Sequence, residues 1–208
     1  MSNSVFVKKY QASEISPVDL REALRYAGNK TQDESVVSLI TQCIMESYSV
    51  LEYKVCYMRT ELVVDGDRII FPFGEIVSFG LGRNLKGCKA AVLFGATIGI
   101  GMDRLITKNS MLSPVKGLCM QGIGAERIEA LCDYFNKEIT DQEKALENIT
   151  RPRFSPGYGD FLLDNQKLFF TILDCHRKIG LTLNQSMLMS PSKSVTAIIG
   201  IKDANKIE

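Results

Sequence analysis

The sequence predicts an α+β fold: a single domain over residues 1–208, with a twisted mixed or antiparallel sheet and flanking helices. Segments with helical apolar periodicity and short β-branched segments follow one another in irregular order. Residues 61–72 read E-L-V-V-D-G-D-R-I-I-F-P, which is typical of a β-hairpin with Asp65-Gly66 in its turn. A doubly wound parallel sheet would instead need strands and helices in regular alternation.

The N-terminal part, about residues 1–52, is predicted to be helical. Ser16-Pro17 has the pattern of an N-cap followed by proline at the first helical position, and Gly28 is placed to end that helix. A second helix follows, because apolar side chains recur at i, i+3, i+4, i+7 and i+8. These side chains are Val36, Leu39, Ile40, Cys43 and Ile44.

The central part is predicted to contain two strands besides the hairpin, then two helices. The strands are K-V-C-Y-M-R at 54–59 and the apolar run C-K-A-A-V-L-F at 88–94. A helix is expected around Met102 to Ile106. Ser113-Pro114 repeats the cap-plus-proline start, and the helix that follows is expected to extend to about Glu147.

A loop and one more helix are predicted before the last strand. Residues 151–160 read R-P-R-F-S-P-G-Y-G-D, and two prolines with two glycines exclude the interior of a helix or strand. Asp164 is expected to begin a helix that Gly180 ends. Residues 194–201, S-V-T-A-I-I-G-I, are rich in β-branched side chains and predict a strand.

Composition argues against nucleic acid and membrane partners. The formal net charge is +1, and no basic run interleaves with aromatic residues. No apolar run approaches the ~20 residues that span a bilayer, and M-S-N-S-V-F-V-K-K-Y does not resemble a signal peptide. The six cysteines include no C-x-x-C pair, which indicates buried thiols in a reducing compartment. We therefore expect a cytoplasmic protein.

Two short motifs imitate cofactor sites. G-A-T-I-G-I-G at 95–101 has Arg104 where a dinucleotide-binding loop needs its last glycine. D-C-H-R-K-I-G at 174–180 contains the only histidine, His176, near the expected end of a helix. Cobalamin-carrying domains bind the cobalt through a histidine in a D-x-H-x-x-G loop, but here the glycine comes one residue late, and cationic side chains are common near the end of a helix. We therefore do not expect this chain itself to carry cobalamin.

Two motifs in the C-terminal third carry a family resemblance. R-F-S-P-G-Y-G-D at 153–160 is followed, after one helix, by G-L-T-L-N-Q-S-M-L-M-S-P-S-K-S-V-T-A-I-I-G at 180–200. Together they resemble the activation domain of cobalamin-dependent methionine synthase, whose motifs are R-x-x-P-G-Y and G-x-x-L-T-E-S-x-x-M-x-P-x-x-S-V-S-G. The resemblance is strong over roughly the last sixty residues and thinner before them.

The resemblance implies a twisted antiparallel sheet and binding of S-adenosylmethionine through motifs within 153–200. It implies a reactivation subunit of methionine biosynthesis, which supports reductive methylation of cob(II)alamin held by a partner. That partner is a cobalamin-bearing methionine synthase or related corrinoid protein, and a flavodoxin-like or ferredoxin-like donor supplies the electron. The chain is expected to bind S-adenosylmethionine without turning over alone, as an accessory subunit of a methyltransferase.

Five residues are expected to bind the cofactor: Arg153 and Glu129 match residues of the family, while Ser155, Gly157 and Tyr158 are assigned from their chemistry. Arg153 is expected to take the ligand's carboxylate, and Glu129 its ammonium group. Ser155 and Gly157 are expected to give backbone contacts to the adenine edge, while Tyr158 offers its ring to adenine or to the cation. No catalytic residue and no metal ligand is expected in this chain.

The sequence departs from the family pattern at three places. Asn184-Gln185 replaces T-E, Thr196-Ala197 replaces S-G, and Ile199 replaces a tyrosine. The family's N-terminal aspartate has no clear counterpart besides Asp19. Two alternatives therefore stay open: an interaction module that has lost ligand binding, and an independent S-adenosylmethionine-dependent methyltransferase.

Overall fold

A five-stranded sheet forms the centre of the computed structural model, which describes residues 4–29 and 33–205. Its strand order is β1-β2-β6-β10-β7, and each neighbouring pair is antiparallel. Its members are β1 (Phe6–Tyr10), β2 (Tyr53–Glu61), β6 (Ala90–Thr97), β7 (Asn148–Thr150) and β10 (Ser194–Asp203). The predicted α+β class is confirmed, and all eight residues of β6 are buried.

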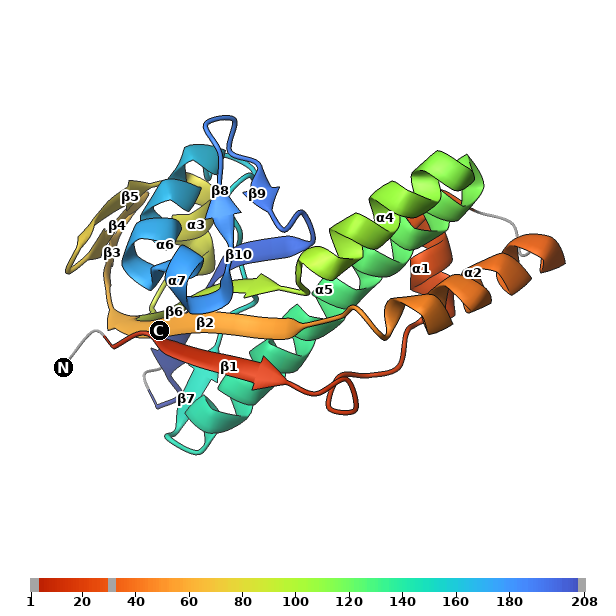
Figure 1. The fold of residues 1–208 in the computed structure, drawn as a ribbon. Helices are drawn as coiled ribbons and strands as arrows, with labels where there is room; N and C mark the ends of the chain where they lie inside the picture. The colour runs from red at the N-terminus through yellow and green to blue at the C-terminus, as the bar shows by residue number, and fades with distance from the viewer. Residues whose placement is uncertain (1–3, 30–32, 206–208) are drawn as a thin grey trace.

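The long helix α5 (Pro114–Lys144) crosses one face of this sheet, and three further helices pack around its N-terminal half (Figure 1). They are α1 (Leu20–Tyr26), α2 (Glu34–Ser47) and α4 (Ile100–Leu112). As predicted, Ser113 caps α5, and its side chain accepts a hydrogen bond from the Lys116 N–H. The apolar stripe of α5 fills a core with the facing side chains Phe94, Ala197 and Ile199.

The other face of the sheet is covered by shorter elements (Figure 1). Helices α6 (Gln166–Leu173) and α7 (Cys175–Ile179) follow a 3-10 turn at Leu163–Asn165. A small sheet accompanies them, with β3 (Val63–Asp65), β4 (Arg68–Phe71), β5 (Gly74–Val77) and the adjoining helix α3 (Phe79–Asn84). A short hairpin, β8 (Thr182–Leu183) and β9 (Met189–Ser190), precedes β10.

Two further local predictions are confirmed, the hairpin turn and the burial of the cysteines. Asp65 and Arg68 close the predicted hairpin, whose turn residue Gly66 has a φ of +62°. All six cysteine side chains are buried as free thiols. Within residues 4–29 and 33–205, no helix is both long enough and apolar enough to span a bilayer.

Other predicted boundaries are wrong. Helix α1 begins at Leu20, and its cap is Asp19, whose carboxylate accepts from two backbone N–H groups. The predicted cap at Ser16-Pro17 fails because both carbonyl oxygens accept hydrogen bonds from a distant arginine. The helical N-terminal part also contains strand β1, and the helix expected from Asp164 to Gly180 breaks at Asp174, where φ is +49°.

Helix α1 lies unusually close to α5 at Gly122. A Cβ atom there would meet the Ala23 carbonyl oxygen at 2.4 Å and the Ala27 nitrogen at 2.7 Å. Because both are backbone atoms, Gly122→Ala is expected to lower the free energy of unfolding by about 1–3 kcal/mol, measured by urea denaturation. In an open helix the same change would stabilise by about 1 kcal/mol.

Gly124 provides the matched control for this prediction. A Cβ atom at Gly124 meets only the flexible Lys193 side chain, at 3.0 Å and beyond. We expect Gly124→Ala to be at least as stable as the wild type. Equal stabilities of the two variants would contradict the close packing of α1 on α5.

Candidate functional site

The loop at 151–160 starts beside β10 and then leaves it. The Arg151 N–H donates to the Gly200 carbonyl oxygen at 2.8 Å, and Phe154 and Ile198 exchange two backbone hydrogen bonds of 2.9 Å. Beyond this pair the loop turns away, because Pro156 has no N–H and Gly157 adopts a φ of +97°. Among the described residues, none extends the sheet beyond Ile198 on this edge of β10, so its first residues border an opening.

A cavity of about 260 Å³ occupies this opening, and we call it the loop cavity. Its walls come from α5, the loop, the start of α6, β9 and the start of β10. The lining residues are Glu129, Arg153, Phe154, Ser155, Pro156, Tyr158, Gln166, Met189, Ser194, Val195 and Thr196. Four of the five residues with predicted roles therefore meet in one cavity. The fifth, Gly157, shapes the loop, and its N–H donates to the Phe161 carbonyl oxygen at 2.7 Å.

Arg153 joins the loop to α5. Its Nη2 lies 2.6 Å from Glu129 Oε2 and its Nη1 lies 2.5 Å from Asp133 Oδ1. Burial opposes the charge of Arg153, but the hydrogen bond to Asp133 and the negative charges nearby raise its pKa above the usual value. One guanidinium and two carboxylates give this side of the cavity a formal net charge of −1.

Asp160 fixes the far end of the loop. Its carboxylate accepts from the Ser78 hydroxyl at 2.9 Å and from the backbone N–H groups of Phe79 and Gly80 at 2.6 and 3.0 Å. These hydrogen bonds hold the pKa of Asp160 below its usual value of 3.8, and the one from the Gly80 N–H contributes most. The loop is therefore tied to the start of α3 as well as to β10.

This arrangement predicts how Asp160→Asn changes stability with pH. Because the folded-state pKa is depressed, the carboxylate stabilises the fold above its unfolded-state pKa, and the contribution is lost as pH falls through the folded-state value. We expect Asp160→Asn to be less stable than the wild type at neutral pH. The difference should shrink below about pH 3.8, as followed by urea denaturation at a series of pH values.

Asp164→Asn serves as the control for Asp160→Asn, since the Asp164 side chain is exposed and forms an exposed ion pair with the nearby Lys167. We expect this variant to unfold like the wild type at neutral pH. If Asp160→Asn keeps a constant deficit down to the lowest pH that preserves the fold, its effect comes from shape rather than charge.

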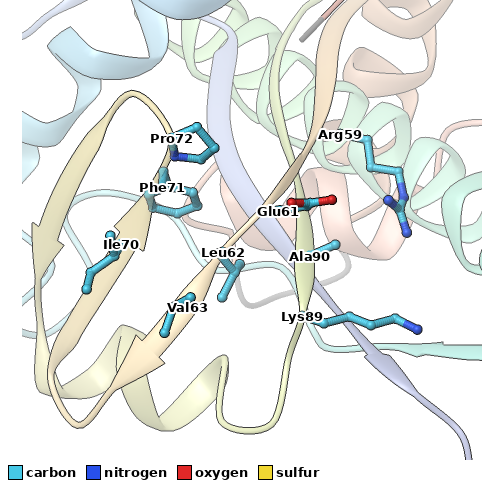
Figure 2. Close-up of a pocket in the computed structure, with 9 residues that line it drawn as sticks. All are labelled: Arg59, Glu61, Leu62, Val63, Ile70, Phe71, Pro72, Lys89 and Ala90. Carbon is cyan, nitrogen blue, oxygen red and sulfur yellow. The ribbon is translucent and has the colours of Figure 1, made fainter. Parts of the chain in front are cut away.

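A larger cavity of about 500 Å³ lies elsewhere, between β4 and the neighbouring ends of β2 and β6. Figure 2 shows Arg59 and Lys89 extending away from the apolar side chains of β4. Both cations already have acidic partners, Glu143 and Asp203. Among the described residues, some buried polar side-chain atoms have no hydrogen-bond partner, but none of these atoms belongs to a residue that lines this cavity. The loop cavity is therefore the better candidate, although it is smaller.

The residues that depart from the family motif mostly lie outside the loop cavity. Ile199 is fully buried in the core beneath α5. The Asn184 carboxamide oxygen accepts from the Ser186 and Leu188 N–H groups, so it forms the turn between β8 and β9. Asp19 caps α1 and does not line the cavity. Thr196 is the exception, since it lines the cavity from β10.

Comparisons with known proteins give a match at the level of structure. No family model and no curated protein matches the sequence. The structure is similar to a crystal structure of the MetH reactivation domain bound to AdoHcy, with a TM-score of 0.70 and 13% sequence identity. The match covers 99% of this chain and 80% of that one. This chain has the reactivation-domain fold.

The reactivation-domain fold confirms the architecture implied by the sequence resemblance. At 13% identity the likeness concerns the course of the backbone and carries no assignment of side chains. The roles expected of Arg153, Glu129 and Tyr158 therefore rest on their place in the loop cavity. Three further participants were not predicted as site residues: Asp133, four residues after Glu129, and the cavity-lining Gln166 and Thr196, the last of which the motif marks as a departure from the family pattern.

Proposed function

We propose that this chain binds S-adenosylmethionine in the loop cavity and reactivates a partner protein, a cobalamin-dependent methionine synthase or related corrinoid protein. One observation carries the proposal: four residues expected to bind the ligand line a single cavity in a chain with the reactivation-domain fold. The similar reactivation domain is bound to AdoHcy, the demethylated form of the same ligand.

The charges of the cavity suit this ligand. S-adenosylmethionine carries a sulfonium, an ammonium and a carboxylate, so its net charge is positive, opposite to that of the Arg153, Glu129 and Asp133 group. Glu129 is placed to accept from the ammonium. A guanidinium has five N–H donors, and those that Arg153 does not use for Glu129 and Asp133 are offered to the carboxylate.

The remaining lining suits the nucleoside. The Tyr158 ring is 65% exposed at the cavity, and its centroid lies 6.2 Å from that of Phe154. It offers a face for stacking on adenine. The backbone of Ser155 and Gly157 is proposed to contact the adenine edge, while Pro156 limits the freedom of the loop between them.

In this role the chain positions the ligand, while the chemistry belongs to the cofactors. When bound, S-adenosylmethionine supplies an activated methyl group for the cobalamin of the partner. A flavodoxin-like or ferredoxin-like donor supplies the one electron that the methylation of cob(II)alamin needs. Tyr158 lines the cavity and is largely exposed, and Leu188, which precedes the lining residue Met189 in the sequence, is exposed as well. Exposed apolar side chains of this kind suit docking of the partner over the ligand.

Isothermal titration calorimetry tests the ligand first. We expect S-adenosylmethionine to bind more tightly than S-adenosylhomocysteine, which lacks the sulfonium charge, and the difference to shrink at high salt. The reactivation role is tested by following the absorbance of cob(II)alamin on a partner methionine synthase with reductant and S-adenosylmethionine. Loss of the cob(II)alamin band should require this chain.

Two other results would replace the proposal. Absence of heat with both ligands would favour an interaction module that has lost its ligand. Steady methylation of a small acceptor without any corrinoid protein would favour an independent methyltransferase.

A further inference from the structure

Two side chains of the loop cavity each keep a polar atom without a hydrogen-bond partner. Gln166, the first residue of α6, is 5% exposed, and Thr196 of β10 is 2% exposed. Across residues 4–29 and 33–205, neither Gln166 Oε1 nor Thr196 Oγ1 has a partner. Buried polar groups without partners destabilise a fold, and native proteins rarely retain them without a use. Two of them at one cavity indicate a ligand.

Both atoms lie on the α6 side of β10. Ile198 packs into the core beneath α6 and α7, whereas Ala197 and Ile199 pack into the core beneath α5. Side chains alternate along a strand, so Thr196 faces the same side as Ile198. Gln166 comes from α6 itself and lines the same cavity. The two side chains therefore approach the cavity from two elements on one side.

The charged groups occupy the opposite side. Glu129 belongs to α5, and Arg153 reaches to it and to Asp133 on the same helix. The cavity thus has an ionic half against α5 and a neutral half against α6. A zwitterionic nucleoside has the same division, with charges on its amino-acid tail and neutral hydrogen-bonding groups on its nucleoside.

The depth of each residue in the neutral half indicates which part of the nucleoside it contacts. Tyr158 is mostly exposed, which places a stacked base at the mouth of the cavity, while Gln166 and Thr196 lie deep. Because the ribose joins the base to the amino-acid tail, a ligand held by Tyr158 and Arg153 would have its ribose between these two residues. An amide oxygen accepts a hydrogen bond, and a threonine hydroxyl accepts and donates, so two adjacent ribose hydroxyls satisfy both.

We propose that Gln166 and Thr196 bind the two ribose hydroxyls and thereby select ribonucleoside ligands. This inference rests on the proposed function, because it takes the ligand to be an S-adenosyl compound. Among the described residues, no protein group bonds either atom, so a ligand diol offers hydrogen bonds that the fold alone does not provide.

Isothermal titration calorimetry with S-adenosylhomocysteine and its 2′-deoxy and 3′-deoxy analogues tests the inference. The near-isosteric variants Gln166→Met and Thr196→Val should each bind S-adenosylhomocysteine about tenfold more weakly than the wild type. Against the analogue without the hydroxyl that the altered residue contacts, variant and wild type should agree within about twofold. The exposed Gln142 of α5 supplies the control, and Gln142→Met should bind like the wild type.

A second measurement guards against unfolding. Since no protein group in the described part of the chain bonds Gln166 Oε1 or Thr196 Oγ1, thermal unfolding of Gln166→Met and Thr196→Val should occur at or above the wild-type temperature. Weaker binding without loss of stability is a signature that a purely structural residue does not give.

Other outcomes overturn the inference. Equal loss for all three ligands means that the residues act through cavity shape. Loss that vanishes instead with the inosine analogue, which lacks the adenine amine, assigns them to the base. If the wild type binds S-adenosylhomocysteine and both variants bind it with the same affinity, this inference alone is overturned. If the wild type does not bind, the proposed function is overturned as well.

Discussion

Replacing Arg127 by methionine is expected to lower the free energy of unfolding by about 3–5 kcal/mol. The Arg127 side chain is 1% exposed and makes two contacts of 2.5 Å with the carboxylate of Glu126, which is also buried. It also donates to the carbonyl oxygens of Ser16 and Pro17. The substitution leaves the buried Glu126 carboxylate, which also accepts from the Asp19 N–H, without its cationic partner, and it removes the donors to two carbonyl groups. Urea denaturation measures the loss.

Two further variants define the cause of this effect. Glu126→Gln/Arg127→Met removes the charge of the stranded carboxylate and is expected to recover a large part of the lost stability. Arg25→Met breaks the exposed pair with Glu22 on α1 and is expected to unfold like the wild type. If Arg127→Met were as stable as Arg25→Met, the buried pair would not be what holds the N-terminal segment to α5.

Replacing Arg153 by alanine is expected to weaken binding of S-adenosylmethionine about ten- to 150-fold. A hydrogen bond to a charged group contributes about 1.5–3 kcal/mol, and each 1.4 kcal/mol corresponds to a factor of ten in affinity. The substitution also leaves Glu129 and Asp133, one helical turn apart, without the cation that links them to the loop. Titration calorimetry measures the change in affinity.

Arg177→Ala is the control for this experiment, because that side chain is 84% exposed on α7. It should bind S-adenosylmethionine like the wild type. Unchanged binding by Arg153→Ala, together with reduced stability, would show that Arg153 serves only to tie the loop to α5. The ligand would then have to be placed elsewhere.

Much of the fold follows from signals that are local in the sequence. The cap and proline at Ser113-Pro114 start α5, and the turn at Asp65-Gly66 closes its hairpin, because each depends on neighbouring residues alone. The start of α1 could not be predicted in this way. Its competing signal at Ser16-Pro17 is overridden by Arg127, more than a hundred residues away.

The same contrast between local signals and long-range contacts applies to the candidate site. The composition of residues 153–158 indicated a binding loop, and the structure places a cavity there. Gln166 carries no distinguishing pattern, since a polar residue at a helix start is common, and Thr196 stands out in the sequence as a departure from the family motif rather than as a ligand-binding residue. Their place in the site results from sheet pairing and helix packing, which bring α6 and β10 together around the loop.

The buried Glu126–Arg127 pair lies one helical turn before Glu129, so the segment before α1 and the ionic half of the loop cavity share the same stretch of α5. A shortened recombinant version beginning at Leu20 would remove the Ser16 and Pro17 carbonyls that hold the Arg127 guanidinium in place. Removing the residues before α1 is therefore expected to disturb ligand affinity as well as solubility. A recombinant version should begin upstream of Ser16.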